Sequence, residues 1–122
     1  MLLDSNILIY ATHPEQTQLR EFIRHTSPVV SVISYIEVFG YHALRDVERD
    51  LLEQLFRVTE VLPLSESVVN QAVALRQQKR MSLGDSIIAA TALVHGHTLV
   101  THNTADFEWV EGIQLLDPFS QT

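Results

Sequence analysis

The chain has 122 residues and no cysteine, and 46 % of its residues are hydrophobic while 19 % are charged. This composition predicts one ordered domain with a sizeable core, and it excludes disulfides, thiolate metal sites and cysteine nucleophiles. The formal net charge of −7 argues against a polyanion partner, and it indicates either acids gathered at a metal site or a basic protein partner.

The amino-terminal stretch MLLDSNILIYA does not have the pattern of a targeting signal. It lacks a basic first segment, and its apolar run is interrupted by Asp4, Ser5 and Asn6. Elsewhere, no segment approaches the roughly 20 apolar residues that a membrane span requires. We therefore expect a soluble cytoplasmic protein, and the lack of cysteine fits a reducing compartment.

The first half of the chain alternates short apolar runs with helical patterns. Pro14 is well placed as the first residue of a helix, and the apolar positions of residues 46–56 recur at helical spacing. In chain order, the predicted elements are a strand over 2–4, a helix over 5–11, a helix from Pro14 to His25, a strand over 28–32 and helices over 33–44 and 46–56.

The second half continues this alternation, without a linker, a repeat or a low-complexity tract. Pro63 indicates that the strand TEVLPL ends there or lies at the edge of a sheet. The predicted elements are a strand over 59–64, a helix over 65–80, a buried helix within the stretch 81–93, a strand over 97–103, a turn or short helix over 104–110 and a strand over 113–117. This order predicts an α/β fold with a mostly parallel sheet covered by helices on both faces.

Four acidic residues fall near the ends of predicted strands. Asp4 closes the first strand, and Glu37 lies in the first turns of the helix after PVVSV. Asp85 opens the buried helix, and Asp106 follows the strand HTLVT. If the sheet is parallel, all four lie at its carboxyl edge, which is where sites form in such sheets.

Each of these acids, taken alone, is explained by helix capping or by an exposed surface position. An acid in the first turn of a helix gains ~0.3–1 kcal/mol from the helix dipole. Three acids have a polar residue three positions before them, as in a capping box. These pairs are Ser82–Asp85, Ser34–Glu37 and, nearly, Asn103–Asp106.

The four acids together need a further explanation, because carboxylates that meet at one sheet edge repel one another. At a separation of about 5 Å and an effective dielectric of ~20, each pair costs roughly 3 kcal/mol. A divalent cation offsets such a cost, and hard oxygen ligands suit Mg²⁺ or Mn²⁺. The set therefore indicates metal-assisted phosphodiester hydrolysis, in which the metal polarises the phosphoryl oxygen and generates hydroxide from bound water.

Four blocks of sequence occur in one order along essentially the whole chain: LLDSNILIY, SYIEVFGY, LGDSIIAATAL and LVTHNTADFEWVEGIQLLDPF. Together they resemble the PIN domain, and in particular the small bacterial ribonuclease toxins of the VapC type. The resemblance implies a PIN-like three-layer fold, with residues 1–122 as a single domain. It also implies a metal-dependent ribonuclease that acts on RNA, a homodimer, and a cognate antitoxin on a separate chain.

The resemblance also implies roles for individual residues. The metal-binding and catalytic set carries over to Asp4, Glu37, Asp85 and Asp106. The residues expected to orient these ligands or the substrate are Ser5, Asn6, Thr101 and Asn103. His102 departs from the pattern, since many relatives carry Arg or another residue between Thr and Asn.

Two other groups of side chains have alternative explanations. The basic cluster of Arg76, Lys79 and Arg80 either contacts RNA phosphates or is a solvated helix end, where cations interact favourably with the helix dipole. The apolar helix around Glu37, with Tyr35 among its residues, either forms a dimer face or packs in the core.

Two other functions compete with the ribonuclease hypothesis. One is a catalytically silent PIN-like binding module, against which the presence of all four acids argues. The other is a phosphoacceptor signalling domain, which should have an acidic pair after its first strand and a lysine at the end of a late strand. Here the first strand is followed by the single acid Asp4, and the sole lysine, Lys79, lies in a predicted helix.

Overall fold

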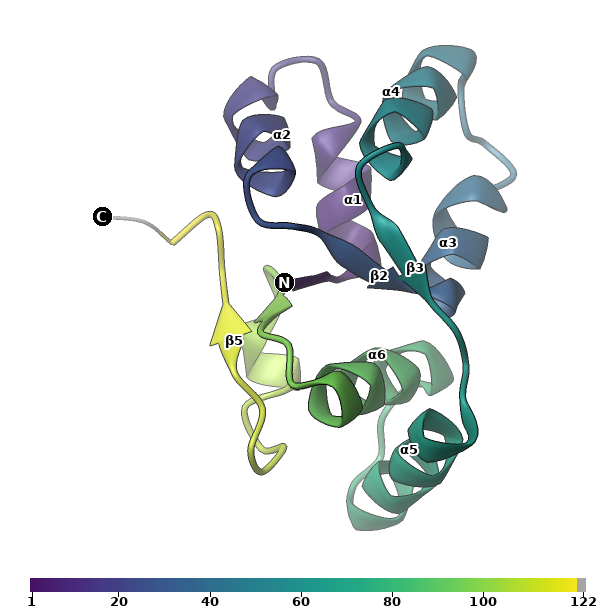
Figure 1. Cartoon of the computed structure of the whole chain (residues 1–122), viewed down its shortest axis with the longest axis vertical. Coiled ribbons are helices and arrows are strands. Elements are labelled where there is room, and N and C mark those ends of the chain that lie inside the picture. The colour runs from purple at the N-terminus through teal and green to yellow at the C-terminus, as the bar shows by residue number, and fades with distance from the viewer. Residues whose placement is uncertain (121–122) are drawn as a thin grey trace.

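The computed structural model describes residues 1–120, which fold around a central parallel sheet (Figure 1). Its strands are β1 (Leu2–Leu3), β2 (Val29–Ser31), β3 (Glu60–Leu62), β4 (Leu99–Val100) and β5 (Leu115–Leu116). The spatial order is β3-β2-β1-β4-β5, so β1 lies in the middle and β3 forms one edge. All neighbouring strands are parallel, which confirms the predicted sheet.

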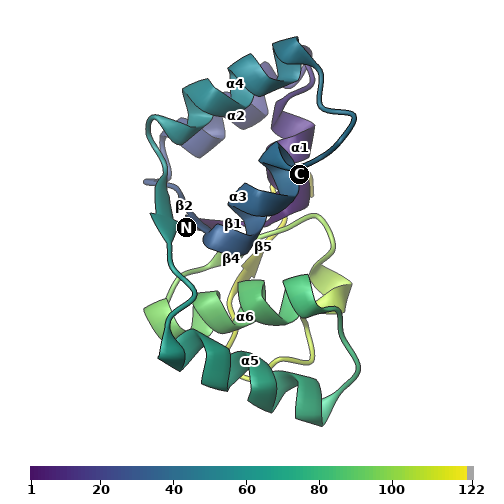
Figure 2. The same ribbon diagram turned by 90° about the vertical axis from the view of Figure 1, so that its right-hand side faces the viewer.

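Helices cover both faces of this sheet and complete a three-layer fold. They are α1 (Ser5–Ala11), α2 (Thr17–Arg24), α3 (Val32–Phe39), α4 (Asp46–Phe56), α5 (Glu66–Gln78), α6 (Leu83–His95) and the 3₁₀ helix η1 (Thr104–Asp106). Helices α1 to α4 lie on one side, and α5 and α6 lie on the other (Figure 2). Within residues 1–120, none of these helices combines the length and hydropathy of a bilayer span.

The two sides of the sheet have separate hydrophobic cores, because successive strand residues point to opposite faces. Leu2 and Leu99 pack with α5 and α6, whereas the next residues, Leu3 and Val100, pack with α1 to α4. Helix α6 is buried at every position from Ser86 to Ala92. The fold therefore anchors the start of α6 and the ends of β1 and β4 on a rigid framework.

Several predicted ends of elements are confirmed. Helix α4 has the predicted bounds, and β3 ends before Pro63 at an edge of the sheet. The Ser82 hydroxyl accepts a hydrogen bond from the Asp85 amide and caps α6. The same helix ends at Gly96, whose φ of 68° is the left-handed conformation that glycine adopts without strain.

The prediction that a helix begins at Pro14 is wrong, because α2 begins at Thr17. The Arg20 guanidinium donates to the main-chain carbonyls of Ala11, His13 and Pro14. These bonds from the side chain satisfy the carboxyl end of α1 and hold the turn before α2. The spacing of residues in the sequence does not reveal these hydrogen bonds, because they form only when α2 folds back on the turn.

Two other predicted elements are too long. The helix predicted over 33–44 ends at Phe39, because the next residue is Gly40 and the chain turns there. The strand predicted over 97–103 is paired only at Leu99 and Val100. Beyond it the chain leaves the sheet, and the side chain of Thr101 is used in the site described below.

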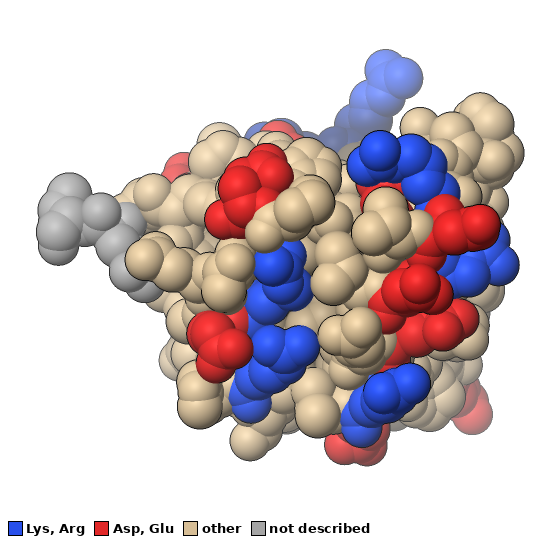
Figure 3. Space-filling model, turned by 90° about the horizontal axis from the view of Figure 1, so that it is seen from above, with Lys and Arg blue, Asp and Glu red and all other residues tan. Residues whose placement is uncertain are grey.

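The outer surface formed by α2 and α4 carries acidic and basic side chains intermixed (Figure 3). Arg24 lies 3.2 Å from Glu21 on α2, and Arg45 lies 3.0 Å from Glu48 at the start of α4. Opposite charges on this face therefore neutralise one another locally.

Candidate active site

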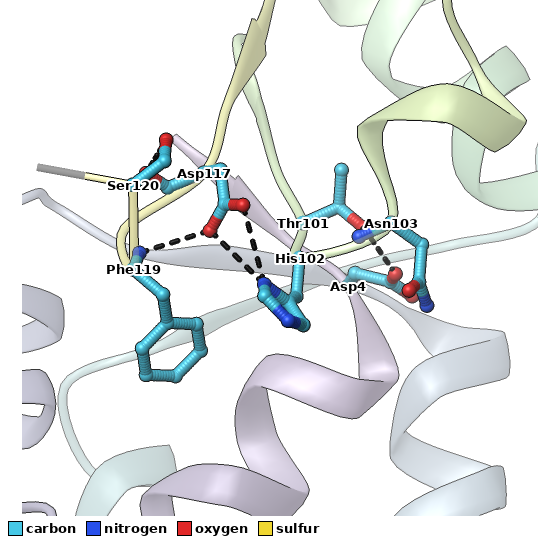
Figure 4. A network of polar contacts seen from close by, with 7 residues as sticks. All are labelled: Asp4, Thr101, His102, Asn103, Asp117, Phe119 and Ser120. Atoms are coloured by element: carbon cyan, nitrogen blue, oxygen red, sulfur yellow. Dashed lines mark hydrogen bonds and ion pairs between the residues drawn. The ribbon is translucent and has the colours of Figure 1, made fainter.

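Asp4 stands at the carboxyl end of the central strand β1, where the chain turns into α1. Its side chain is only 5 % exposed, and its Oδ2 accepts a 2.8 Å hydrogen bond from the hydroxyl of Thr101, which follows β4 (Figure 4). The Thr101 hydroxyl also accepts a hydrogen bond from the amide of Asn103 at 3.1 Å. Thr101 is fully buried, and its hydrogen bond holds the Asp4 carboxylate in one orientation.

Glu37 is oriented by Ser5, the residue after Asp4. The Ser5 hydroxyl donates to Glu37 Oε1 at 2.6 Å and shares a 2.9 Å contact with the hydroxyl of Ser34. The predicted capping role of Ser34 is wrong, since Ser31 caps α3 by accepting from the Ile33 amide. Ser34 instead lies one turn into α3, fully buried, beside Ser5. Ser34 therefore belongs to the site. The sequence did not reveal this, because the spacing of Ser34 and Glu37 is also that of a capping box.

Gly84 lets the Glu37 carboxylate approach the start of α6. A Cβ atom at this position would lie 3.1 Å from Glu37 Oε2, closer than an ordinary van der Waals contact. The carboxylate of α3 therefore lies against the residue that precedes Asp85. A glycine within the first turn of a helix, where alanine is preferred, was the available sequence signal for this close approach.

Asp85 and Asp106 complete the set of acids. Asp85 is half-buried in the first turn of α6, where the Ser82 cap holds its amide at 3.1 Å. Asp106 is exposed in η1, and its carbonyl accepts a 3.1 Å hydrogen bond from the indole N–H of Trp109. We call Asp4, Glu37, Asp85 and Asp106 the acidic cluster.

The charges of the acidic cluster act on one another. Burial raises the pKa of Asp4, and the charges of Asp85 and Glu37 raise it further against the opposing hydrogen bond from Thr101. Burial also raises the pKa of Asp85, with added repulsion from Asp106 and Glu37. The four acids, which come from four segments, are therefore near enough for their charges to interact, while their joint role at one sheet edge stays a prediction.

Among the described residues, no basic side chain compensates the charge of the acidic cluster. Within residues 1–120, no Lys, Arg or His forms an ion pair with a member of the acidic cluster. Carboxylates without a counter-charge, two of which accept a hydrogen bond from a hydroxyl group, have the chemistry of a site for a hard divalent cation.

The spacing of the carboxylates limits how such a cation would be held. In the part of the chain that the structure describes, no three acidic or imidazole side chains stand close enough to hold one ion between them. Mg²⁺ commonly keeps several waters and binds one or two carboxylates directly. The donor set therefore fits an ion held partly through water rather than an all-protein cage.

The other residues predicted for the site lie differently. Asn6 is exposed on the first turn of α1, and Asn103 is exposed at the start of η1, where its amide bonds Thr101. His102 points away from Asp4: its Nδ1 lies 3.2 Å from Asp117 Oδ2, and its ring packs edge-on against Phe119 (Figure 4). His102, Asp117 and Phe119 form what we call the carboxyl-terminal clamp.

Comparison with known proteins agrees with this geometry. The model of the PIN domain matches residues 1–112. The chain is 33 % identical to ribonuclease VapC10 of Mycobacterium tuberculosis over 129 aligned positions, which cover 98 % of this chain and 93 % of that protein. It is also 42 % identical to ribonuclease VapC1 of Rickettsia felis, but over only 32 % of this chain and 31 % of that protein.

Similar solved structures include complexes of such proteins. A toxin–antitoxin complex from Klebsiella pneumoniae contains a chain with a TM-score of 0.79 and 28 % identity, covering 97 % of both chains. DNA-bound VapBC from Salmonella typhimurium has a TM-score of 0.79 and 25 % identity, covering 95 % of this chain and 96 % of that one. With its sheet order, its acidic cluster and these similarities, the chain belongs to the PIN-domain family and, within it, to the VapC type.

Proposed function

We propose that this protein is a divalent-metal-dependent endoribonuclease and the toxin of a toxin–antitoxin pair. The observation that supports the proposal is the acidic cluster: its four carboxylates come from four segments, their charges act on one another, and within residues 1–120 none of them has a basic partner. Membership of the VapC type supports RNA as the substrate, because ribonuclease VapC10 is similar over 98 % of this chain.

In this proposal, the acidic cluster holds Mg²⁺ or Mn²⁺ directly or through water. A bound ion would polarise a phosphoryl oxygen and lower the pKa of an attacking water. The chain's own contribution is placement: Thr101 orients Asp4, Ser5 orients Glu37, and the Ser82 cap fixes Asp85 at the start of α6. Asn6 and Asn103 are exposed beside these groups and would contact the substrate.

The test is cleavage of single-stranded RNA with added Mn²⁺ or Mg²⁺, comparing the wild type with Asp85→Asn. A matched control is Asp50→Asn, which removes the same charge from an exposed position on α4. We expect cleavage by the wild type and the control and a large loss in Asp85→Asn. Undiminished cleavage in Asp85→Asn would contradict the assignment.

A catalytically silent PIN-like binding module is the second candidate. One observation favours it: within residues 1–120, no three acidic or imidazole side chains stand close enough to hold one ion between them. Calorimetric titration with Mn²⁺ separates the two: binding that disappears in Asp4→Asn supports the nuclease, and no binding by the wild type supports the silent module. The phosphoacceptor alternative has no comparable support, because Lys79 follows α5 and not a strand.

We also propose a cognate antitoxin as a partner, supported by the toxin–antitoxin complex from Klebsiella pneumoniae. Purification of this chain together with the product of the neighbouring reading frame tests it. A stable complex that suppresses RNA cleavage is the expected result, whereas separate elution with unchanged cleavage would rule out that partner.

The proposal further includes a homodimer in which residues 1–122 act as a single PIN-like domain. Helix α3 leaves Ile36 59 % exposed, while Tyr35 packs against Phe56 of α4 and is 43 % exposed. One side of the apolar helix around Glu37 therefore packs in the core, and its outer side exposes apolar side chains to solvent. Light scattering of the wild type and of Ile36→Lys tests the dimer, which the charge should dissociate.

A further inference from the structure

Three of the chain's cations are engaged in local contacts. The sequence has eight Lys and Arg residues. Arg20 donates to main-chain carbonyls after α1, and Arg24 and Arg45 pair with acids of their own helices. On the surface of α2 and α4, positive and negative side chains are accordingly intermixed (Figure 3).

Three further cations lie close together at the end of α5. Arg76, Lys79 and Arg80 are all exposed, and within residues 1–120 none of them forms an ion pair with a carboxylate. They lie within five residues of sequence, together with Gln77 and Gln78, along a surface depression of about 470 Å³. We call residues 76–80 the basic segment.

The basic segment is joined to the acidic cluster through Trp109. The Lys79 ammonium lies 5.6 Å from the centre of the indole ring, and the indole N–H donates to the carbonyl of Asp106 at 3.1 Å. The connection between α5 and α6 then leads from Arg80 to Asp85 in five residues. In Figure 2 the basic segment's end of α5 and the start of α6 lie at the same end of the lower helical layer.

We propose that the basic segment binds the phosphates of the RNA strand next to the bond that the acidic cluster cleaves. This inference rests on the proposed ribonuclease function. A chain of net charge −7 repels RNA, so the strand needs local cations beside the acids to stay bound. Two guanidinium groups and an ammonium group supply strong phosphate donors, and the two neighbouring glutamines add neutral donors.

Trp109 acts in this arrangement as a brace. Lys79 lies over its ring, and its N–H is bonded to the main chain, so the indole joins two segments instead of offering both faces to a base. The brace ties the position of Asp106 to that of the basic segment.

The experiment compares two triple variants that carry the same net charge. In one, Arg76, Lys79 and Arg80 are changed to Gln; in the matched control, Arg24, Arg49 and Arg57 are changed to Gln. All six residues are exposed, and each triple removes three positive charges. Binding of fluorescein-labelled single-stranded RNA is measured by anisotropy at several salt concentrations, in the Asp85→Asn background to prevent cleavage, and melting temperatures check that each variant folds.

We expect the variant of the basic segment to bind RNA about tenfold more weakly at low salt. Its slope of log affinity against log salt should be shallower by about 2, since each phosphate contact to a single strand contributes roughly 0.7. In the cleavage-competent chain, the same three substitutions should raise KM and leave kcat nearly unchanged. The control triple should keep the wild-type slope and KM.

Equal salt slopes in the two triples would overturn the inference, because the effect would then be one of net charge. It would also be overturned if the variant of the basic segment kept RNA binding and lost only the binding of polyglutamate, which would assign the segment to an acidic protein partner. If the wild type neither binds nor cleaves RNA, the proposed function fails as well. If the wild type cleaves RNA and the variant's KM is unchanged, only this inference fails.

A second variant tests the brace separately. Trp109→Phe keeps an aromatic ring under Lys79 and removes the hydrogen bond to the Asp106 carbonyl. We expect kcat to fall severalfold with little change in KM or in the salt slope, which would identify Trp109 as a positioning residue. A change in the melting temperature alone, with normal kcat, would show that the indole serves only stability.

Discussion

The tripeptide Leu-Leu-Asp occurs twice in this chain, at residues 2–4 and 115–117, and the aspartates of the two copies have different surroundings. In both, the leucines form a strand and the aspartate follows at its carboxyl end. Asp4 is buried beside the central strand with a hydroxyl as its partner. Asp117 follows the edge strand β5 and lies 3.2 Å from the imidazole of His102.

The difference shows that the position of the strand in the sheet decides which groups surround the aspartate that follows it. β1 lies between β2 and β4, so Asp4 meets Thr101 and the charges of Asp85 and Glu37. Asp117 lies outside this group, and its Oδ1 accepts the amide of Phe119 at 2.9 Å within the carboxyl-terminal clamp. One acid is left available for a cation, while the other is satisfied by the protein.

The largest expected effect contrasts the two acids directly. Asp4→Asn should reduce RNA cleavage by at least about 100-fold, because it removes a charge that the metal needs. Asp117→Asn should leave cleavage within a fewfold of the wild type. Rates measured on the same RNA with Mn²⁺ check this, and a comparable loss in both variants would show that the carboxyl-terminal clamp takes part in the reaction.

A smaller effect is expected from the partner that orients Asp4. Thr101→Val keeps the shape of the buried side chain but removes the hydroxyl that donates to Asp4. Loss of such an orienting contact typically costs 10- to 100-fold in metal affinity or activity, so we expect a reduction of about that size. Thr101→Ser, which restores the hydroxyl, should recover most of the activity; if it does not, the role of Thr101 is packing.

Stability without metal should depend on pH in a direction set by Asp4 and Asp85. Their pKa values lie above the ordinary 3.8, so in the window between the unfolded and folded pKa the folded chain binds more protons than the unfolded chain. The free energy of unfolding therefore rises as pH falls through that window, and at neutral pH the full penalty is present. Asp4→Asn should thus raise the melting temperature at neutral pH in EDTA.

Added Mg²⁺ should reverse this order of stabilities. An ion at 100 times its dissociation constant stabilises the folded state by about 2.7 kcal/mol, which corresponds to a rise of several degrees in the melting temperature. The wild type should show this rise and Asp4→Asn should not. Equal shifts in both proteins would mean that the ion binds elsewhere.

The smallest effect concerns the carboxyl-terminal clamp. The His102 side chain is 45 % exposed and the Asp117 side chain 15 %, so solvent screens their interaction. Asp117→Asn should lower the free energy of unfolding by no more than about 1 kcal/mol. Urea unfolding measures it, with Glu108→Gln, an exposed acid near η1, as a control. A loss of several kcal/mol would show that the clamp holds the edge strand in place.

The sequence by itself determined the alternation of strands and helices, the buried character of α6 and the caps at Ser82 and Gly96, because these depend on contacts within a few residues. It also placed Asp4 directly after the first strand, and it predicted that the four acids lie at one edge of a parallel sheet. It misplaced the start of α2, which depends on bonds from the Arg20 side chain to the preceding turn.

Only the tertiary structure decided which polar groups meet. Thr101 and Asp4 are 97 residues apart and touch because β4 pairs with β1. The role of Ser34 beside Ser5, the close approach of Glu37 to Gly84 and the difference between the two Leu-Leu-Asp copies arise in the same way. Local patterns set the direction and period of each segment, but the neighbour of a buried carboxylate follows from strand order, which no single segment contains.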